Sequence, residues 1–218
     1  MIKLEKINKI FANDFHALKD ISLHVRKGEL VLLKGASGSG KSTILSLIAG
    51  LSKPSSGEVI VKEERISKLP DDFASLFRRE NIGFIFQKFN LIEDLSVRDN
   101  IIIPLIPSSF DESLIDKRVD ALLAMLDISE KKDQLVRNLS GGQQQRVVIA
   151  RALMNEPSII IADEPTANLD EKLSLDFVEF LKLLKSEGKT ILLATHDPLF
   201  FDLPFVDKII EIQKGVLQ

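Results

Sequence analysis

Cysteine is absent from the sequence, and neither sign of charge dominates, with a formal net charge of −3 over 218 residues. A chain without cysteine forms neither disulfides nor thiolate metal sites. A protein that grips nucleic-acid phosphates normally carries a basic stripe, and the lack of one here predicts no nucleic-acid partner. The longest uncharged apolar stretches, residues 42–52 and 101–110, are about half as long as the ~20 residues of a membrane-spanning helix.

The first ten residues also lack the apolar core of a signal peptide, since they carry Lys3, Glu5, Lys6 and Lys9. Together with the missing membrane span, this predicts a chain that does not insert into a membrane by itself. We therefore expect a cytoplasmic protein.

The composition is that of a globular protein, with 44% hydrophobic and 28% charged residues. A chain of this length can bury roughly 70–75% of its unfolded surface in one compact domain. No internal repeat, low-complexity tract or linker rich in proline, glycine and serine divides it. The expected organisation is one domain over residues 1–218.

Apolar patterns along the chain predict alternating strands and helices. Ile21, Leu23 and Val25 alternate with polar residues, which is typical of a half-buried strand. Further strands are predicted at 29–34, 58–62, 158–163 and 190–195, and helices at 42–51, 114–127 and 171–187. Such alternation indicates an α/β domain. Residues 69–140 show helical pattern and little strand pattern, so a helical subdomain is expected within about 69–157.

The segment GASGSGKS follows a predicted strand and precedes a predicted helix, as the pattern G-x-x-x-x-G-K-[ST] requires. Its glycines let backbone N–H groups converge on phosphate oxygens, and the helix N-terminus adds partial positive charge. Lys41 is expected to reach the β- and γ-phosphates, and the Ser42 hydroxyl to bind Mg²⁺. The alternative is a solvent-exposed glycine-rich turn. The expected nucleotide contacts are Gly35, Ala36, Ser37, Gly38, Ser39, Gly40, Lys41, Ser42 and Thr43.

Two other predicted strands end in residues suited to phosphate chemistry. After one of them, Asp163 can hold Mg²⁺ and Glu164 can orient or deprotonate an attacking water. His196 follows another strand, and because ligands gather beyond the carboxyl ends of parallel strands, we expect it to contact the γ-phosphate. An acidic pair on its own could simply end a strand, and a lone histidine is usually structural, which is our interpretation of His16 and His24.

A second glycine-rich segment, NLSGGQQQR, spans residues 138–146. Ser140 can cap the helix that follows and leave free N–H groups around Gly141 and Gly142, which would make another anion site. Since the first loop already encloses the phosphates, this site would bind a different anion or the triphosphate of another subunit. The alternative is an ordinary capped helix.

The sequence LSGGQ, with the phosphate loop upstream and DEP-x-x-x-LD downstream, resembles the ABC ATPase family over nearly the whole chain. The resemblance implies an α/β P-loop NTPase fold with a mixed parallel core sheet, an antiparallel β subdomain and a helical signature subdomain. It also implies ATP and Mg²⁺ as cofactors, and Mg²⁺-dependent ATP hydrolysis as the activity.

The resemblance assigns further roles, residue by residue. Gln87 matches the glutamine that senses Mg²⁺ or the water and couples to the membrane subunit, and Asp170 matches an aspartate at the dimer interface. The residues that match the signature, which closes on the ATP of the opposite subunit in a head-to-tail dimer, are Ser140, Gly141, Gly142 and Gln143. The resulting catalytic set is Lys41, Gln87, Glu164 and His196. The metal set is Ser42, Gln87 and Asp163.

Near its N-terminus the family usually stacks a tyrosine on the adenine ring, but this chain has no tyrosine. Phe11 is the matching aromatic residue. A phenylalanine offers the same π-face without the hydroxyl, so the stacking role is retained in principle. The alternative is that Phe11 is a core residue.

Residues 78–105 resemble one branch of the family, which serves lipoprotein release, macrolide-type efflux, antimicrobial-peptide export and the cell-division complex. The branch implies a subunit that dimerises with ATP and lies peripheral to the inner or plasma membrane on a transmembrane permease. The cargo would be a lipid, lipoprotein, peptide or drug. The alternative is a cell-division-type ATPase that regulates cell-wall enzymes without transport. The short stretch after His196 predicts no C-terminal regulatory domain.

Other classes fit the motifs less well. A DNA-repair member needs a long coiled-coil insertion and a translation member needs two ATPase domains, whereas the interval from Ser42 to Leu139 has no sustained heptads. A GTPase would carry an N-K-x-D motif, which does not occur. By the same family resemblance, we expect Phe89 and Leu91 to line a groove that receives a short helix of the membrane subunit.

Overall fold

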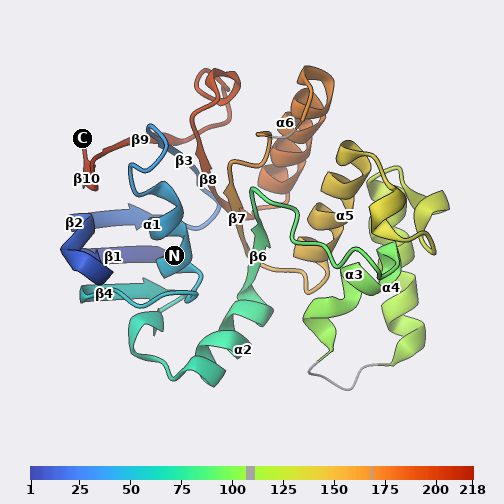
Figure 1. Ribbon diagram of the computed structural model, residues 1–218, viewed down its shortest axis with the longest axis horizontal. Coiled ribbons are helices and arrows are strands. Elements are labelled where there is room, and N and C mark those ends of the chain that lie inside the picture. Colours follow the sequence, from blue (N-terminus) through green and yellow to red (C-terminus); the bar gives the residue numbers. More distant parts are fainter. Residues whose placement is uncertain (107–110, 168) are drawn as a thin grey trace.

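This computed structural model describes residues 1–106, 111–167 and 169–218. Residues 107–110, at the end of one apolar stretch, and residue 168, inside the DEP-x-x-x-LD motif, lie outside the described residues. Figure 1 shows an antiparallel sheet at the left, a group of helices at the right and the core sheet between them. None of the described helices is both long and apolar enough to cross a membrane.

The core sheet has the strand order β10-β9-β3-β8-β7-β6. Its strands are β3 (Leu30–Lys34), β6 (Ile82–Ile85), β7 (Ile159–Asp163), β8 (Thr190–Thr195), β9 (Lys208–Gln213) and β10 (Val216–Leu217). All neighbours are parallel except β10, which returns antiparallel to β9. The predicted mixed sheet is confirmed.

Both faces of the core sheet are covered, which explains why its central strands are continuous apolar runs. In strand β3, alternate side chains belong to two different apolar clusters. Val31 and Leu33 pack with helix α1 (Lys41–Ile48) and the antiparallel sheet. Leu30 and Leu32 pack with helices α5 (Gly141–Leu153) and α6 (Glu171–Ser186). The sheet is thereby fixed between α1 on one side and α5 and α6 on the other.

The antiparallel sheet has the order β2-β1-β4-β5, as the family resemblance implied. Its strands are β1 (Ile2–Phe11), β2 (Phe15–Val25), β4 (Ser56–Val61) and β5 (Glu64–Arg65). The alternating residues of β2 behave as predicted, since Ile21, Leu23 and Val25 are buried. Phe11 and Phe15 pair across the β1–β2 turn, so two aromatic rings lie at the end of this sheet.

Residues 69–140, predicted to contain little strand, include one short strand that the sequence pattern did not indicate, at Ile82–Ile85. These residues form β6, an edge strand parallel to β7 in the core sheet. A run of four residues is too short to show a period, and the strand is defined by its pairing with β7. The α-helices of this region are α2 (Asp71–Asn81), α3 (Val97–Ile102) and α4 (Glu112–Met125), and α5 follows directly after it.

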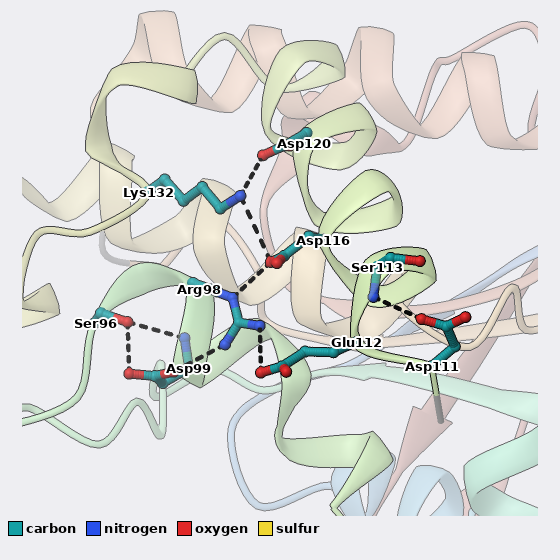
Figure 2. Close-up of polar contacts among 9 residues, drawn as sticks. All are labelled: Ser96, Arg98, Asp99, Asp111, Glu112, Ser113, Asp116, Asp120 and Lys132. Carbon is teal, nitrogen blue, oxygen red and sulfur yellow. Dashed lines mark hydrogen bonds and ion pairs between the residues drawn. The ribbon is translucent and has the colours of Figure 1, made fainter. Parts of the chain in front are cut away.

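A network of ion pairs joins α3 and α4 (Figure 2). Arg98 Nε lies 2.7 Å from Asp116 Oδ1, while Lys132 Nζ lies 2.7 Å from Asp120 Oδ1 and 3.6 Å from Asp116 Oδ1. The hydrogen bond from Arg98 holds the pKa of the Asp116 carboxyl below its ordinary value. Since Arg98 is on α3 and Asp116 on α4, these contacts link the two helices.

Candidate functional site

The glycine-rich loop connects β3 to α1, as predicted. Two of its glycines cannot be replaced without a clash. A Cβ at Gly35 would lie 2.3 Å from the Ile212 carbonyl oxygen, and Gly40 combines a φ of 113° with a Cβ position 2.8 Å from Leu18 Cδ2. Since an L-residue rarely adopts such a φ, the spacing of glycines reflects the backbone path.

The turn between β9 and β10 is hydrogen-bonded to this loop. The Gly215 N–H donates to the Ser39 carbonyl oxygen at 2.9 Å, and the Lys19 N–H donates to the Gly215 carbonyl oxygen at 2.8 Å. A Cβ at Gly215, where φ is 78°, would lie 2.5 Å from the Ala17 carbonyl oxygen. The glycine therefore connects the loop to β2 through a close backbone contact.

A cavity of about 250 Å³ lies over the loop. Its lining joins residues from distant parts of the sequence, namely Phe11, Phe15, Ala17, Ser37, Gly38, Ser39, Gly40, Lys41, Ser42, Thr43, Gln87, Glu164 and His196. The loop, Glu164 and His196 therefore line one cavity at the ends of the core strands, and Gln87, which only the family resemblance indicated, lines it as well.

Two phenylalanines at the edge of this cavity are largely exposed, Phe11 at 45% and Phe15 at 60%. Phe11 is thus not a core residue, and Lys9 Nζ lies 5.0 Å from its ring centroid. Phe15 was not among the predicted site residues. The available signal was its place directly after the turn that follows Phe11, because paired strand ends bring their side chains together.

Lys41 is 5% exposed and is held by three oxygen atoms. Its Nζ donates to the carbonyl oxygens of Gly35 at 2.7 Å and Ala36 at 3.2 Å, and lies 3.2 Å from Glu164 Oε1. Burial of an ammonium group is costly without such partners. The carboxylate of Glu164 thus neutralises Lys41 inside the cavity.

Glu164 occupies a strained turn at the end of β7, with a φ of 44°. Its backbone N–H donates to the Ala194 carbonyl oxygen at 2.8 Å, and its Oε2 lies 3.0 Å from His196 Nδ1. Burial raises the pKa of Glu164, but the hydrogen bonds from His196 and Lys41 outweigh it and hold the pKa below its ordinary value. The carboxylate therefore stays ionised at neutral pH.

Asp163, the last residue of β7, is placed differently. Its Oδ1 is buried and has no hydrogen-bond partner in the part of the chain that the structure describes. Burial raises the pKa of Asp163, the nearby charge of Glu164 adds to the rise, and a hydrogen bond with Ser42 opposes it. A buried carboxylate beside a hydroxyl is the donor set that Mg²⁺ takes alongside phosphate oxygens. The residues present therefore fit this metal ion.

The second glycine-rich segment forms the capping structure that was predicted. Ser140 is the N-cap of α5, with its Oγ accepting the Gln143 N–H at 3.4 Å and its own N–H donating to Gln143 Oε1 at 3.0 Å. A Cβ at Gly142 would lie 2.5 Å from Leu173 Cδ1. Ser140, Gly141, Gly142 and Gln143 do not line the cavity over the first loop.

Asp170 is also a helix cap and also lies outside that cavity. Its Oδ1 accepts the Leu173 N–H at 2.9 Å at the start of α6, and its side chain is exposed. The exposed position leaves one side of the carboxylate open to solvent.

In the apolar segment after Gln87, the groove expected at Phe89 and Leu91 stays a prediction, because both side chains keep part of their surface accessible. Phe89 and Leu91 are half-buried against the main apolar cluster, and Arg151 holds the Phe89 carbonyl oxygen at 2.8 Å. A different cavity, of about 390 Å³, lies beside β6 and includes Phe84 and Phe86. Their rings stack with centroids 4.1 Å apart. Apolar residues beside a loop can pack inward, and a sequence pattern does not show which ones do.

A phosphate-type loop between a parallel strand and a helix, with acidic residues at a neighbouring strand end, defines a P-loop nucleoside-triphosphate-binding protein. Residues 18–167 match the family model described as ABC transporter, and the chain belongs to that family. The predicted ABC ATPase cassette and its fold are therefore confirmed.

Individual relatives agree with this assignment. The chain is 41% identical to an uncharacterised ABC transporter ATP-binding protein of Methanocaldococcus jannaschii, across 99% of this chain and 96% of that protein. It is 43% identical to the macrolide export ATP-binding/permease protein MacB of Psychrobacter cryohalolentis, across 92% of this chain but 30% of MacB. The chain thus spans about a third of its MacB relatives.

A solved structure has the same fold. It is a dimeric post-hydrolysis state of an ATP-binding cassette bound to ADP and Pi, with a TM-score of 0.92 and 39% sequence identity. The match covers 100% of this chain and 97% of that one. A second dimeric structure, of a bacterial ABC transporter cassette, matches with the same TM-score of 0.92.

Proposed function

We propose that the chain hydrolyses ATP in the cavity over residues 35–43 and passes the resulting dimer closure to a transmembrane permease. The observation that carries the proposal is the contact of Lys41 with Glu164 and of Glu164 with His196 inside one cavity. A buried cation, an ionised carboxylate and an imidazole are thereby assembled around a phosphate-type loop.

Lys41 is proposed to exchange its contact with Glu164 for the β- and γ-phosphate oxygens of ATP, because these carry more negative charge. The loop N–H groups would bind the remaining phosphate oxygens. Ser42 and Asp163, with Gln87, would hold Mg²⁺, which when bound neutralises charge on the β- and γ-phosphates. The unpartnered oxygen of Asp163 supports this role, because burial of a carboxylate oxygen without a donor is otherwise unfavourable.

Glu164, released from Lys41, is proposed to accept a proton from the attacking water. The water oxygen bonds to the γ-phosphorus while the bond to the bridging oxygen of ADP breaks, in line. His196, whose side chain is 65% exposed, would keep Glu164 in position through Nδ1 and contact the γ-phosphate. Phe11, with Phe15 beside it, would stack on the adenine ring.

The signature residues are proposed to act on the ATP of a second copy of the chain. Ser140–Gln143 and Asp170 lie outside the cavity that contains Lys41, so within one copy they do not line the same site. A dimeric cassette with 39% identity supports a closed pair of chains. We expect dimerisation with ATP and not in its absence.

A transmembrane permease is the proposed partner, and the cavity that includes Phe84 and Phe86 is its proposed docking groove. The MacB relatives are named as joint ATP-binding and permease proteins, which supports a permease here. They also favour export of a lipid, lipoprotein, peptide or drug over a cell-division role. The chain would then lie peripheral to the inner or plasma membrane.

Steady-state ATP hydrolysis by the purified chain, with Mg²⁺, tests the proposal. Replacement of Lys41 by Ala removes the buried cation, and removal of such a clamp typically costs about 10²–10³ in rate. The exposed Lys53, replaced by Ala, serves as the matched control and should leave the rate within about twofold of the parent. A Lys41→Ala chain as active as the control would refute the assignment.

A further inference from the structure

The turn after β7 contains Glu164, and the loop after β8 contains His196. β7 and β8 are parallel neighbours in the core sheet, so both segments leave the same edge of it (Figure 1). The His196 side chain is 65% exposed, and its Nδ1 lies 3.0 Å from Glu164 Oε2. Little packing surrounds an imidazole this exposed, so its position depends on how the loop that carries it is held.

Asp197, the next residue of that loop, is hydrogen-bonded through three of its polar atoms. Its backbone N–H donates to Thr195 Oγ1 at 3.0 Å, and its Oδ1 accepts the Leu199 N–H at 3.0 Å. Its Oδ2 accepts the Thr166 hydroxyl at 3.2 Å. The first two contacts lie within two residues along the chain, whereas the third joins the loop to the turn after β7.

Thr166 belongs to the same turn as Glu164, two residues further along the chain. The turn is closed by the Ala167 N–H, which donates to the Glu164 carbonyl oxygen at 3.2 Å. Thr166 is 6% exposed and is not among the residues that line the nucleotide cavity. A change of its hydroxyl therefore removes no group from that cavity.

The side-chain contacts between this turn and the His196 loop are of two kinds. The backbone N–H of His196 and its Nδ1 both lie near Glu164 Oε2, at 3.3 Å and 3.0 Å. In the proposed cycle that carboxylate accepts a proton from water, which removes the charge that attracts the imidazole. The hydrogen bond from Thr166 to Asp197 does not involve Glu164, so it can hold the loop throughout the reaction.

We propose that Thr166 is a positioning residue for ATP hydrolysis, which acts through Asp197 on His196. Its hydroxyl fixes the Asp197 carboxylate and thereby keeps the neighbouring imidazole directed at the γ-phosphate. The inference rests on the function proposed above for His196. A small displacement of a group that contacts the reacting phosphate is enough to slow the reaction, because the transition state requires a narrow geometry.

Thr166→Val tests this role, because valine keeps the shape of threonine but has no hydroxyl. Steady-state ATP hydrolysis by the full chain should show a kcat about tenfold below that of the parent. The KM for ATP should stay within about twofold, since Thr166 does not line the nucleotide cavity. Thr166→Ser keeps the hydroxyl and should restore kcat to within about threefold of the parent. A Thr166→Val chain with the kcat of the parent would overturn the proposal.

Thr190→Val is the matched control that separates positioning from a loss of stability. Thr190 is fully buried at the opposite end of β8, and its Oγ1 accepts the Gly28 N–H at 3.0 Å. The same substitution there also removes a buried hydrogen bond, so it should lower the thermal unfolding temperature. Its kcat should nevertheless stay within about twofold of the parent. If both valine variants lower kcat equally, the effect is one of stability and the proposal is wrong.

His196→Ala distinguishes a failure of this inference from a failure of the proposed function. We expect its kcat to fall by about 10², because it loses the contact with the γ-phosphate. If His196→Ala is slow and Thr166→Val is as fast as the parent, only the role of Thr166 is wrong. If His196→Ala is as fast as the parent, the function proposed for His196 is wrong, and positioning by Thr166 is wrong with it.

Discussion

Glu164 has two tasks in the proposed cycle, since it neutralises Lys41 before ATP arrives and serves as the base afterwards. Gln in its place keeps the size of the side chain but accepts no proton. We expect Glu164→Gln to bind ATP without turnover, so that two chains stay closed around two nucleotides. Size-exclusion chromatography should show a dimer with ATP that ADP does not support.

The exposed Glu187, replaced by Gln, is the control for this change and should hydrolyse ATP like the parent. A Glu164→Gln chain that remains monomeric in saturating ATP, or that turns over normally, would count against the assigned role.

Single residues also show what a sequence can and cannot predict. Gly35, Gly40 and Lys41 were found from spacing alone, because the backbone path of the loop leaves few choices at those positions. Phe15 belongs to no motif and reaches the cavity only because β1 and β2 pair at their ends. The unpartnered oxygens of Asp163 and Gln145 are equally invisible in a sequence, since burial depends on the whole fold.

At the scale of elements, the stabilising contribution of the ion pair between Arg98 on α3 and Asp116 on α4 can be tested by changing the pH. The pKa of Asp116 is lowered in the folded protein by the hydrogen bond from Arg98, so its contribution to stability is present above the unfolded pKa. That contribution is lost as pH falls through the lowered value, below about 4. We expect Asp116→Asn to lower the thermal unfolding temperature at pH 7, and to lower it by less at pH 3.

Unfolding curves followed by circular dichroism from pH 3 to pH 7 would measure this difference. Should the gap between parent and variant stay constant across that range, the amide would be disturbing the packing of α3 and α4 and not the ion pair.

Long periodic elements were predicted well, and the errors lie where an element depends on its neighbours. The helix at 171–187 carries enough apolar residues to show a period, and the strands at 158–163 and 190–195 are continuous apolar runs of typical strand length. β6 has four residues and exists because β7 lies beside it. Phe89 and Leu91 are half-buried, and Arg151, on α5, donates to the Phe89 and Asn90 carbonyl oxygens, a contact that no local sequence pattern indicates.

At the scale of the whole molecule, the separation of Lys41 from Ser140 predicts complementation between chains. A Lys41→Ala chain has intact signature residues, and a Ser140→Arg chain has an intact phosphate loop. A mixed dimer of the two should therefore contain one competent site out of two. We expect ATPase activity in the mixture to exceed that of either variant alone, in a steady-state assay at several mixing ratios.

Circular dichroism of the Ser140→Arg chain is the necessary control, since loss of the helix cap costs about 1 kcal/mol. If both chains are folded and no mixture exceeds the inactive parents, the signature residues do not act between chains.

The proposed docking of the whole molecule on its membrane partner can be tested at the cavity beside β6. Phe86 lines the cavity beside β6 and stacks on Phe84, so an aspartate there would place a charge in an apolar groove. We expect Phe86→Asp to lose co-purification with the permease from native membranes, while basal ATPase of the isolated chain stays within a few-fold. Phe73→Asp is the control, since Phe73 is exposed on α2 and does not line the groove. Undiminished co-purification would place the docking site elsewhere.

The turn at Gly215 lies outside the nucleotide cavity but contacts the loop that lines it. Its N–H donates to the Ser39 carbonyl oxygen and its carbonyl oxygen accepts from the Lys19 N–H, so the turn is joined directly to the phosphate loop and to β2. Protein engineers could therefore adjust nucleotide affinity from the outer surface, without altering any group that lines the cavity. For the same reason, peptide insertions into the β9–β10 hairpin are a poor choice for attaching labels.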